Sequence, residues 1–208
     1  EDEEMATAKT RNWFIENPQR GRSNNSALLV RDDTSKETFN KLMSCVKEYG
    51  EPGFVWAEST EMGFNPCVEI GLYPVDLETG KSGWQFCNLA EINGKRANTE
   101  EKFYQACKAA AIVGTLQAAY TSFPYVGETT ERITRREALL GVSITGMMDN
   151  PDVLFDPQIQ RNGAKIVKDT NKEIAQIIGI NPAARTTCVK PAGSTSCILG
   201  TASGIHPH

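Results

Sequence analysis

Short apolar runs alternate along this chain with longer segments of helical periodicity, and this alternation limits the possible folds more than any other feature. Six runs have the composition of β-strands: SALLV at 26–30, FVW at 54–56, PCVEIGL at 66–72, FCNLAEI at 86–92, GVSIT at 141–145 and TTCVK at 186–190. Four segments predict helices: 34–49, 99–120, about 129–140 and 156–179. Strands that alternate with helices of this length indicate an α/β domain whose sheet is largely parallel.

Capping residues predict where the helices begin and end. Thr34 and Glu37 form a capping box at the start of the first helix, and Gly50 is expected to end it. We expect Asn98 to cap the second helix. The fourth should begin at Asp156, which a proline follows. Four of its isoleucines are expected to face the core: Ile159, Ile166, Ile174 and Ile178.

Charge and hydropathy argue against two classes of partner. The formal net charge is -4, whereas nucleic-acid-binding domains usually carry clustered lysine and arginine. The sequence contains no apolar run of the roughly 18 residues that span a membrane. Its first residues, EDEEMATAKT, are acidic rather than a basic lead-in to an apolar signal segment. We therefore expect a cytoplasmic protein that binds neither nucleic acid nor membrane.

The six cysteines show none of the short paired spacings that zinc sites or dithiol redox motifs use. In the reducing cytosol structural disulfides are not expected, so most of these thiols should be core residues, Cys107 in the second helix among them. No metal site is predicted.

The chain has no internal repeat, low-complexity tract or long linker, which favours one continuous domain over residues 1–208. It does not begin with Met, and it stops at SGIHPH without a helix cap. We therefore expect a piece of a longer polypeptide.

Asn65, Cys67 and Glu69 alternate with other residues in the stretch FNPCVEIGL. In an extended strand alternate side chains share a face, so the three groups are expected to project together. A neighbouring carboxylate raises the pKa of a thiol and disfavours the nucleophilic thiolate. A neutral cysteine that becomes a thiyl radical can instead take a hydrogen atom from an unreactive carbon, while the carboxylate accepts a proton from the hydroxyl on that carbon. The competing interpretation makes Cys67 a small buried residue and Glu69 a solvated one.

The segment VKPAGSTSCILG, at 189–200, runs from a strand into a small turn rich in hydroxyl groups. Backbone N–H groups and hydroxyls of such a turn can bind an anion without a lysine. The residues of this candidate anion loop are Ala192, Gly193, Ser194, Thr195 and Ser196. Most turns of this composition only cap a helix, so that interpretation stays open. Cys87, in FCNLAEI, is by composition a core thiol, although beside a radical cysteine it would suit a reductant.

Taken together, NPCVEI, FCNLAEI, KPAGSTS and the lead-in GRSNNS closely resemble the catalytic subunits of ribonucleotide reductases, in the order those enzymes use. The segments GEPGF, RREALLGVSITG and SGIHP are most similar to the adenosylcobalamin-dependent class. The resemblance covers nearly the whole chain but only part of such an enzyme. It implies the later half of a ten-stranded α/β barrel, made of two parallel halves set antiparallel, with the radical cysteine on a finger loop inside.

The resemblance also implies roles for the candidate residues. Cys67 resembles the thiyl-radical cysteine that abstracts the ribose 3′ hydrogen, Glu69 resembles the base at the 3′ hydroxyl, and Asn65 would hydrogen-bond the sugar. Cys87 resembles one of two reducing cysteines that protonate the departing 2′ hydroxyl and end as a disulfide, and its family partner would precede residue 1. The loop 192–196 resembles the substrate-phosphate loop, where the family more often has serine in place of Ala192.

The implied activity is the radical-based reduction of ribonucleotides to 2′-deoxyribonucleotides for DNA synthesis, with adenosylcobalamin as cofactor. The implied partners are the ribonucleotide, a thioredoxin-like reductant and the remaining part of the barrel. Because the N-terminal barrel half and the C-terminal cysteine tail would lie elsewhere, we expect the isolated chain to be inactive. The alternative is a non-catalytic nucleotide-binding or assembly fragment of a split enzyme, active only in trans. A hydrolase that pairs Cys67 with His206 or His208 is disfavoured, because Glu69 lies beside the thiol.

Overall fold

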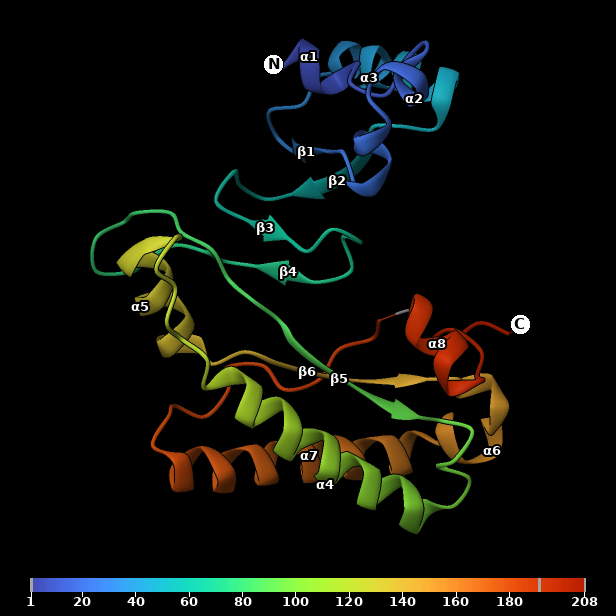
Figure 1. Ribbon diagram of the computed structural model, residues 1–208, viewed down its shortest axis with the longest axis vertical. Helices are drawn as coiled ribbons and strands as arrows, with labels where there is room; N and C mark the ends of the chain where they lie inside the picture. The colour runs from blue at the N-terminus through green and yellow to red at the C-terminus, as the bar shows by residue number, and fades with distance from the viewer. Residues whose placement is uncertain (1, 191, 208) are drawn as a thin grey trace. The chain divides into compact units, whose positions relative to one another are not determined.

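The computed structural model describes residues 2–190 and 192–207 (Figure 1). The chain divides into two compact units, Glu1–Tyr73 and Pro74–His208. The first unit contains a small parallel sheet and a hairpin, and the second contains a parallel sheet packed against long helices. The predicted α/β class is confirmed.

The first unit is built around a β–α–β unit that short helical segments precede. Its elements in chain order are α1 (Glu3–Ala6), α2 (Trp13–Glu16), η1 (Pro18–Arg22), β1 (Ser26–Val30), α3 (Lys36–Tyr49), β2 (Gly53–Ala57), β3 (Gly63–Phe64) and β4 (Gly71–Leu72). Strands β1 and β2 pair in parallel, and α3 connects them. The predicted strands at 26–30 and 54–56 and their parallel arrangement are confirmed.

The two ends of α3 show one wrong and one correct prediction. Ser35 caps the helix in place of Thr34, because its hydroxyl accepts a hydrogen bond from the backbone N–H of Thr38 at 3.1 Å. Thr34 instead donates its hydroxyl to the carbonyl of Val30 at 2.7 Å. Gly50 ends the helix as predicted, with a left-handed φ of 76° that glycine adopts without a Cβ clash.

The strand predicted at 66–72 is wrong for residues 66–70, and only Gly71 and Leu72 lie in a strand. Strands β3 and β4 form a short antiparallel pair, and the residues between them form the tip of a hairpin. Val68, in this tip, has a φ of 67°, a left-handed conformation that no continuous strand contains. The side-chain alternation of a strand therefore does not hold here. A turn, rather than one face of a strand, positions Asn65, Cys67 and Glu69.

The second unit is built on the parallel pair of β5 and β6. Its elements are β5 (Asn88–Asn93), α4 (Glu100–Ala118), α5 (Gly127–Glu137), β6 (Leu140–Thr145), η2 (Met147–Asp149), α6 (Pro151–Leu154), α7 (Pro157–Ile178) and α8 (Ser194–Leu199). The segment 185–190 follows the other edge of β6 in parallel, since the Cys188 N–H donates to the Val142 carbonyl at 3.0 Å. The extended runs predicted at 86–92, 141–145 and 186–190 thus lie side by side, the last through a single β-bridge.

In the second unit, the predicted ends of α7 are correct, whereas the predicted cap of α4 is shifted by one residue. Thr99 caps α4 by accepting a hydrogen bond from the backbone N–H of Lys102 at 3.3 Å, whereas Asn98, the predicted cap, accepts from the Lys102 side chain. Helix α7 begins at Asp156 and ends at Gly179, as predicted. Within the part of the chain that the structure describes, no helix is both long and apolar enough to cross a membrane.

The face of α7 that packs inward differs from the predicted one. Its buried residues are Gly163, Val167, Thr170, Asn171 and Ala175. The predicted isoleucines are half-buried: Ile159, Ile166, Ile174 and Ile178. Of these, Ile159 and Ile166 pack against the core, as predicted. Close packing against α4 explains the shift, because a Cβ at Gly163 would lie 2.6 Å from the ring of Phe103. The Asn171 side chain also donates to the Thr115 hydroxyl of α4 at 2.9 Å.

The β5–β6 sheet has an apolar face that helices cover and a second face that is mainly small and polar. Helix α4 packs on both strands, and α4 and α7 lie on the same side of the sheet (Figure 1). Ile92, Leu140 and Val142 belong to the core on this side, and each such buried side chain contributes about 1.5–3 kcal/mol. Alternate residues point the other way. This second face carries mainly small and polar residues of the two strands: Glu91, Asn93, Gly141, Ser143 and Thr145.

Candidate active site

Asn65 closes the hairpin tip that carries Cys67. The Asn65 N–H donates to the Ile70 carbonyl at 3.3 Å, and the Ile70 N–H donates to Asn65 Oδ1 at 3.0 Å. The Val68 N–H donates to the Asn65 carbonyl at 2.9 Å. One asparagine therefore holds both sides of the turn. Its side-chain oxygen is engaged in the fold, and its NH2 group remains as the hydrogen-bond donor.

Burial separates the two reactive groups of the tip. The Cys67 side chain is exposed, whereas Glu69 is half-buried and its Oε2 atom is fully enclosed. The competing interpretation, with a buried Cys67 and a solvated Glu69, is therefore wrong. The tip thus places a carboxylate two residues from an accessible thiol.

Two features outside these side chains shape the tip. Val68 has a positive φ although it is β-branched, and backbone strain of this kind concentrates at functional sites. Asn24, in the segment GRSNNS just before β1, donates its side-chain N–H to the Pro66 carbonyl. This bond links the hairpin tip to the start of β1.

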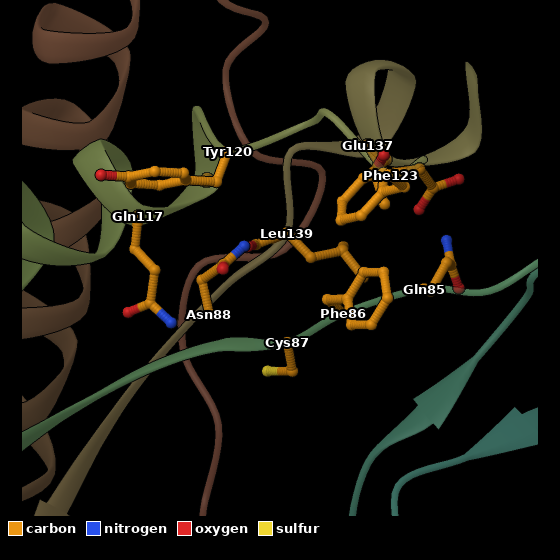
Figure 2. Close-up of a pocket in the computed structure, with 11 residues that line it drawn as sticks. Gln85, Phe86, Cys87, Asn88, Gln117, Tyr120, Phe123, Glu137 and Leu139 are labelled. Atoms are coloured by element: carbon orange, nitrogen blue, oxygen red, sulfur yellow. The ribbon is translucent and has the colours of Figure 1, made fainter. Parts of the chain in front are cut away.

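Cys87 immediately precedes β5 and is half-buried. Figure 2 shows its side chain on the opposite side of the strand from Phe86 and Asn88. Those two residues line a pocket of about 310 Å³, in which the rings of Phe86 and Phe123 stack with centroids 5.0 Å apart. Cys87 borders the pocket, but its thiol is directed to the face of the sheet that α4 does not cover.

Several polar residues on that face were not predicted. The Thr145 hydroxyl donates to Glu91 Oε2 at 2.8 Å, and Thr145 itself is fully buried. The Ser143 hydroxyl accepts from the Lys190 N–H at 3.2 Å and so joins β6 to the segment 185–190. In the sequence, Glu91, Ser143 and Thr145 are each an acidic or hydroxyl residue within an otherwise apolar run. In the sequence this signal does not distinguish a functional group from a structural one.

The predicted anion loop forms the start of α8. Gly193 stands at the N-cap position, and no side chain caps the helix. Ser194 and Thr195 are exposed, whereas Ser196 is buried and its hydroxyl donates to the Gly193 carbonyl at 2.8 Å. Ala192 is buried, and its carbonyl accepts a hydrogen bond from Ser203. Two of the three predicted hydroxyls are therefore open to solvent, and the third stabilises the turn.

The loop lies where the parallel strands end. The Lys95 ammonium group, just after β5, donates to the Gly200 carbonyl at 3.1 Å. The Met147 N–H, just after β6, donates to the Gly204 carbonyl at 3.0 Å. These bonds hold the residues that follow α8 against the carboxyl ends of both strands. Ligands of open parallel α/β sheets usually bind at this edge.

Two further predictions concern Cys107 and the histidines. Cys107 packs in the core, as predicted, and burial raises the pKa of its thiol to about 12. His206 is exposed in the second unit, whereas Cys67 belongs to the first, and His208 lies outside the described residues. The hydrolase alternative stays a prediction that the sequence disfavours.

No family model matches the chain, but curated proteins are similar to it. An adenosylcobalamin-dependent ribonucleoside-triphosphate reductase from Lactobacillus leichmannii is 24% identical over 231 residues, which cover 89% of this chain and 29% of the relative. A probable adenosylcobalamin-dependent ribonucleoside-triphosphate reductase from Dictyostelium discoideum is 24% identical over 217 residues, or 91% of this chain and 26% of the relative. An adenosylcobalamin-dependent ribonucleoside-triphosphate reductase from Euglena gracilis is 23% identical over 180 residues, which cover 77% of this chain and 23% of the relative.

A crystal structure of a B-12 dependent (class II) ribonucleotide reductase superposes on this chain with a TM-score of 0.66. The identity is 21%, and the match covers 96% of this chain and 33% of that one, which shows a shared α/β fold. The chain spans less than a third of the length of the curated relatives. The resemblance to adenosylcobalamin-dependent ribonucleotide reductases, first indicated by the motifs, is confirmed by these relatives.

Proposed function

We propose that this chain is part of the catalytic barrel of a cytoplasmic adenosylcobalamin-dependent ribonucleotide reductase, namely a single partial domain from the later half of that barrel. The observation that carries the proposal is the hairpin tip. It presents an exposed Cys67, with Asn65 closing the turn and Glu69 partly withdrawn from water. The similarity to the curated reductases supports the proposal because it extends over 89% of the chain.

The first step uses the hairpin residues. When bound, adenosylcobalamin would supply the radical that removes the hydrogen atom of the Cys67 thiol. The exposure of Cys67 fits this requirement, and none of the described residues is assigned to hold the corrin ring. The Cys67 sulfur then takes the 3′ hydrogen of the ribose while Glu69 accepts the proton of the 3′ hydroxyl. The NH2 group of Asn65 donates a hydrogen bond to the sugar.

The second step uses Cys87. One thiol protonates the 2′ hydroxyl, which leaves as water, and two thiols together supply two electrons and end as a disulfide. Cys87 is one of these thiols, and the other belongs to the part of the barrel that lies outside this chain. A thioredoxin-like dithiol then reduces the disulfide by exchange and restores both thiols.

The loop at the start of α8 would bind the substrate phosphates. Ser194 and Thr195 supply exposed hydroxyls, and the loop sits at the carboxyl edge of the parallel strands. Ala192, where the family more often has serine, is only 3% exposed. Its side chain belongs to the interior, so backbone N–H groups and the two open hydroxyls carry the interaction with the anion.

The test is turnover of this chain after mixing with the complementary barrel segments of a related reductase. We expect deoxyribonucleotide formation only when adenosylcobalamin is present. Cys67→Ser should lower turnover by about 10³-fold or more while nucleotide binding persists, because only the radical-carrying sulfur is lost. Cys45→Ser, which removes a half-buried thiol of α3, is the matched control and should leave turnover unchanged.

Undiminished turnover by Cys67→Ser would refute the assignment of the radical cysteine. Nucleotide binding without turnover in every mixture would favour the alternative, a non-catalytic nucleotide-binding or assembly fragment.

A further inference from the structure

Gly141, the second residue of β6, lies between two thiols. The position that a Cβ atom would occupy on Gly141 is 2.6 Å from Cys87 Sγ and 3.1 Å from Cys188 Sγ. The two sulfur atoms therefore lie no farther apart than the sum of these distances. Because glycine has no side chain, the space over its Cα is filled by the two thiols together with the Leu89 side chain, whose Cδ2 atom is 2.8 Å from the same Cβ position.

Three segments distant in the sequence create this arrangement. Leu89 pairs with Gly141 in the β5–β6 register, and Cys87, two residues before Leu89, shares its face of the strand. Cys188 comes from the opposite edge of β6, where its N–H donates to the Val142 carbonyl at 3.0 Å. Neither cysteine lies within one of the paired strands. Cys87 precedes the first paired residue of β5, and Cys188 belongs to a segment with a single β-bridge.

We propose that Cys87 and Cys188 form a thiol–disulfide exchange pair, in which Cys188 receives the disulfide bond that Cys87 acquires. The Cys188 thiolate attacks the Cys87 sulfur of a disulfide between Cys87 and a second thiol. The bond from Cys87 to Cys188 forms, the original bond breaks, and the second sulfur leaves as a thiolate that takes up the proton lost by Cys188. One disulfide is consumed and one is formed, so the exchange needs no added oxidant.

The other thiols do not fit this role. Cys107 lies among the helices behind the sheet, where it is 2% exposed and its thiol is protonated at neutral pH. Cys197 is exposed on α8, and Cys45 belongs to α3 of the first unit. Cys87 and Cys188 are both half-buried, which lets small disulfides reach them while β6 keeps them together.

The pair flanks an intervening strand, and this affects the bond that it forms. Adjacent strands are about 4.8 Å apart, so a bond across β6 requires the segment 185–190 and the residues before β5 to move toward each other. A disulfide formed with such movement is strained and is reduced more readily than a relaxed one. We therefore expect a transient bond that a dithiol reopens, as an exchange site requires.

The pairing of the two thiols stands on the sheet geometry alone. Its use during turnover rests on the proposed function, since there the first disulfide would arise from reduction of the substrate. The test uses neither nucleotide nor cofactor, so its result is independent of whether the chain takes part in ribonucleotide reduction.

The experiment treats the reduced 208-residue chain with glutathione disulfide, followed by alkylation of the remaining thiols and peptide mass spectrometry. We expect a Cys87–Cys188 disulfide as the main internal bond of the unmodified sequence. In Cys188→Ser, which changes little in size, the mixed disulfide of Cys87 with glutathione should accumulate roughly tenfold more, because no neighbouring thiol displaces it. Cys197→Ser is the control and should behave like the unmodified chain.

Equal amounts of the mixed disulfide with and without Cys188 would overturn the proposal. A main internal bond between other cysteines, or a Cys87 that stays unmodified in both proteins, would also overturn it. Gly141→Ala is a second test of whether the two thiols meet over Gly141. The variant is first shown to be folded by circular dichroism. The added methyl group displaces the Cys87 sulfur, so the internal disulfide should decrease while glutathione still reaches Cys87.

Discussion

The hairpin that carries Cys67 and the sheet that carries Cys87 and Cys188 hold their thiols by different means. In the hairpin, hydrogen bonds to Asn65 close a tip whose strands pair through only two residues each, and Cys67 stays exposed. In the sheet, two six-residue strands and the helices behind them hold the half-buried Cys87 against Gly141. The first arrangement is local in the sequence, and the second joins three distant segments.

This difference determines how each region should respond to substitution. A local turn can change while the rest of the unit keeps its fold, because few packing contacts depend on it. A side chain in a packed sheet and helix layer cannot move alone, since its neighbours fill the space around it at the density of an organic crystal. The same type of substitution should therefore have a larger effect in the sheet than in the hairpin.

The largest expected contrast is in thiol reactivity. With a pKa of about 12, Cys107 is a thiolate in only about one molecule in 10⁴ at pH 8, against roughly one in ten for a thiol with the ordinary pKa of 9.0. We expect iodoacetamide to modify Cys107 roughly 10³-fold more slowly than free cysteine, and the exposed Cys67 to be modified early. Timed alkylation with peptide mass spectrometry measures both rates, and equal labelling of the two in folded protein would contradict the contrast.

The raised pKa of Cys107 also has a consequence for stability. The folded protein favours the protonated thiol, while the unfolded chain releases this proton near the ordinary value of 9.0. Above that pH the unfolded state binds fewer protons than the folded state, so the free energy of unfolding should fall as the pH rises toward 12. In Cys107→Ala this alkaline loss should be smaller in urea titrations.

The next largest effect is expected from a matched pair of glycines. A Cβ at Gly94, at the end of β5, would lie 2.5 Å from the Gly146 carbonyl oxygen and 2.8 Å from that of Thr145. Backbone atoms cannot rotate away, so Gly94→Ala should lower the free energy of unfolding by about 3 kcal/mol. In the hairpin, a Cβ at Gly71 meets its nearest atom, in the Phe64 ring, at 3.8 Å.

Gly71→Ala should therefore change the free energy of unfolding by no more than about 0.5 kcal/mol. Urea unfolding followed by circular dichroism compares the two variants. Similar losses from both would show that the hairpin is as tightly packed as the sheet.

A smaller and local effect is expected at Asn65. Asn65→Ala removes the oxygen that accepts from the Ile70 N–H and should cost about 1 kcal/mol locally, which corresponds to roughly fivefold faster amide exchange at Ile70. Asn65→Asp retains an oxygen acceptor and is the control. Hydrogen exchange measured by NMR separates them, and slow exchange in both variants would mean that other contacts hold the tip.

The smallest effect is expected at Asp76, in the first turn of the second unit. Its pKa is lowered mainly by a hydrogen bond from the Thr79 hydroxyl at 2.6 Å, with a further contribution from Arg132 of α5. A lowered pKa means that stability is present above the ordinary value of 3.8 and is lost as the pH falls through the lower folded value. Asp76→Asn should be less stable than the unmodified chain near pH 7.

The two proteins should converge in stability as the pH falls below about 4, where the carboxylate becomes protonated. Thermal unfolding across this range tests the sign. A difference that grows toward acid pH would contradict the role assigned to the Thr79 and Arg132 contacts.

Sequence patterns predicted the elements whose signals are local. The strand β1 and both ends of α7 follow from apolar runs and caps within a few residues. The caps of α3 and α4 were each displaced by one residue, because Thr34 and Ser35, like Asn98 and Thr99, are neighbours that can both accept a backbone hydrogen bond. Only the path of the first helical turn selects between them.

The hairpin shows a different reason for error. The order Asn65, Cys67, Glu69 has the period of a strand, yet the hydrogen bonds between Asn65 and Ile70 reverse the chain and give Val68 a left-handed backbone. A period of two in a short stretch does not distinguish a strand from a tight turn, because the residue types alone do not show whether the backbone stays extended or reverses. The strand geometry predicted for Asn65, Cys67 and Glu69 is therefore wrong, whereas their catalytic roles stay a prediction.

The sequence by itself determined the α/β class, the composition of the hairpin tip and the resemblance to the adenosylcobalamin-dependent reductases, since all three depend on residue types at short spacing. Only the tertiary structure placed Cys188 beside Cys87 and gave both a glycine to lie against. That neighbourhood requires β6 to pair with β5 on one edge and with the segment 185–190 on the other. Strand pairing joins residues that are far apart in the chain, so no local pattern contains it.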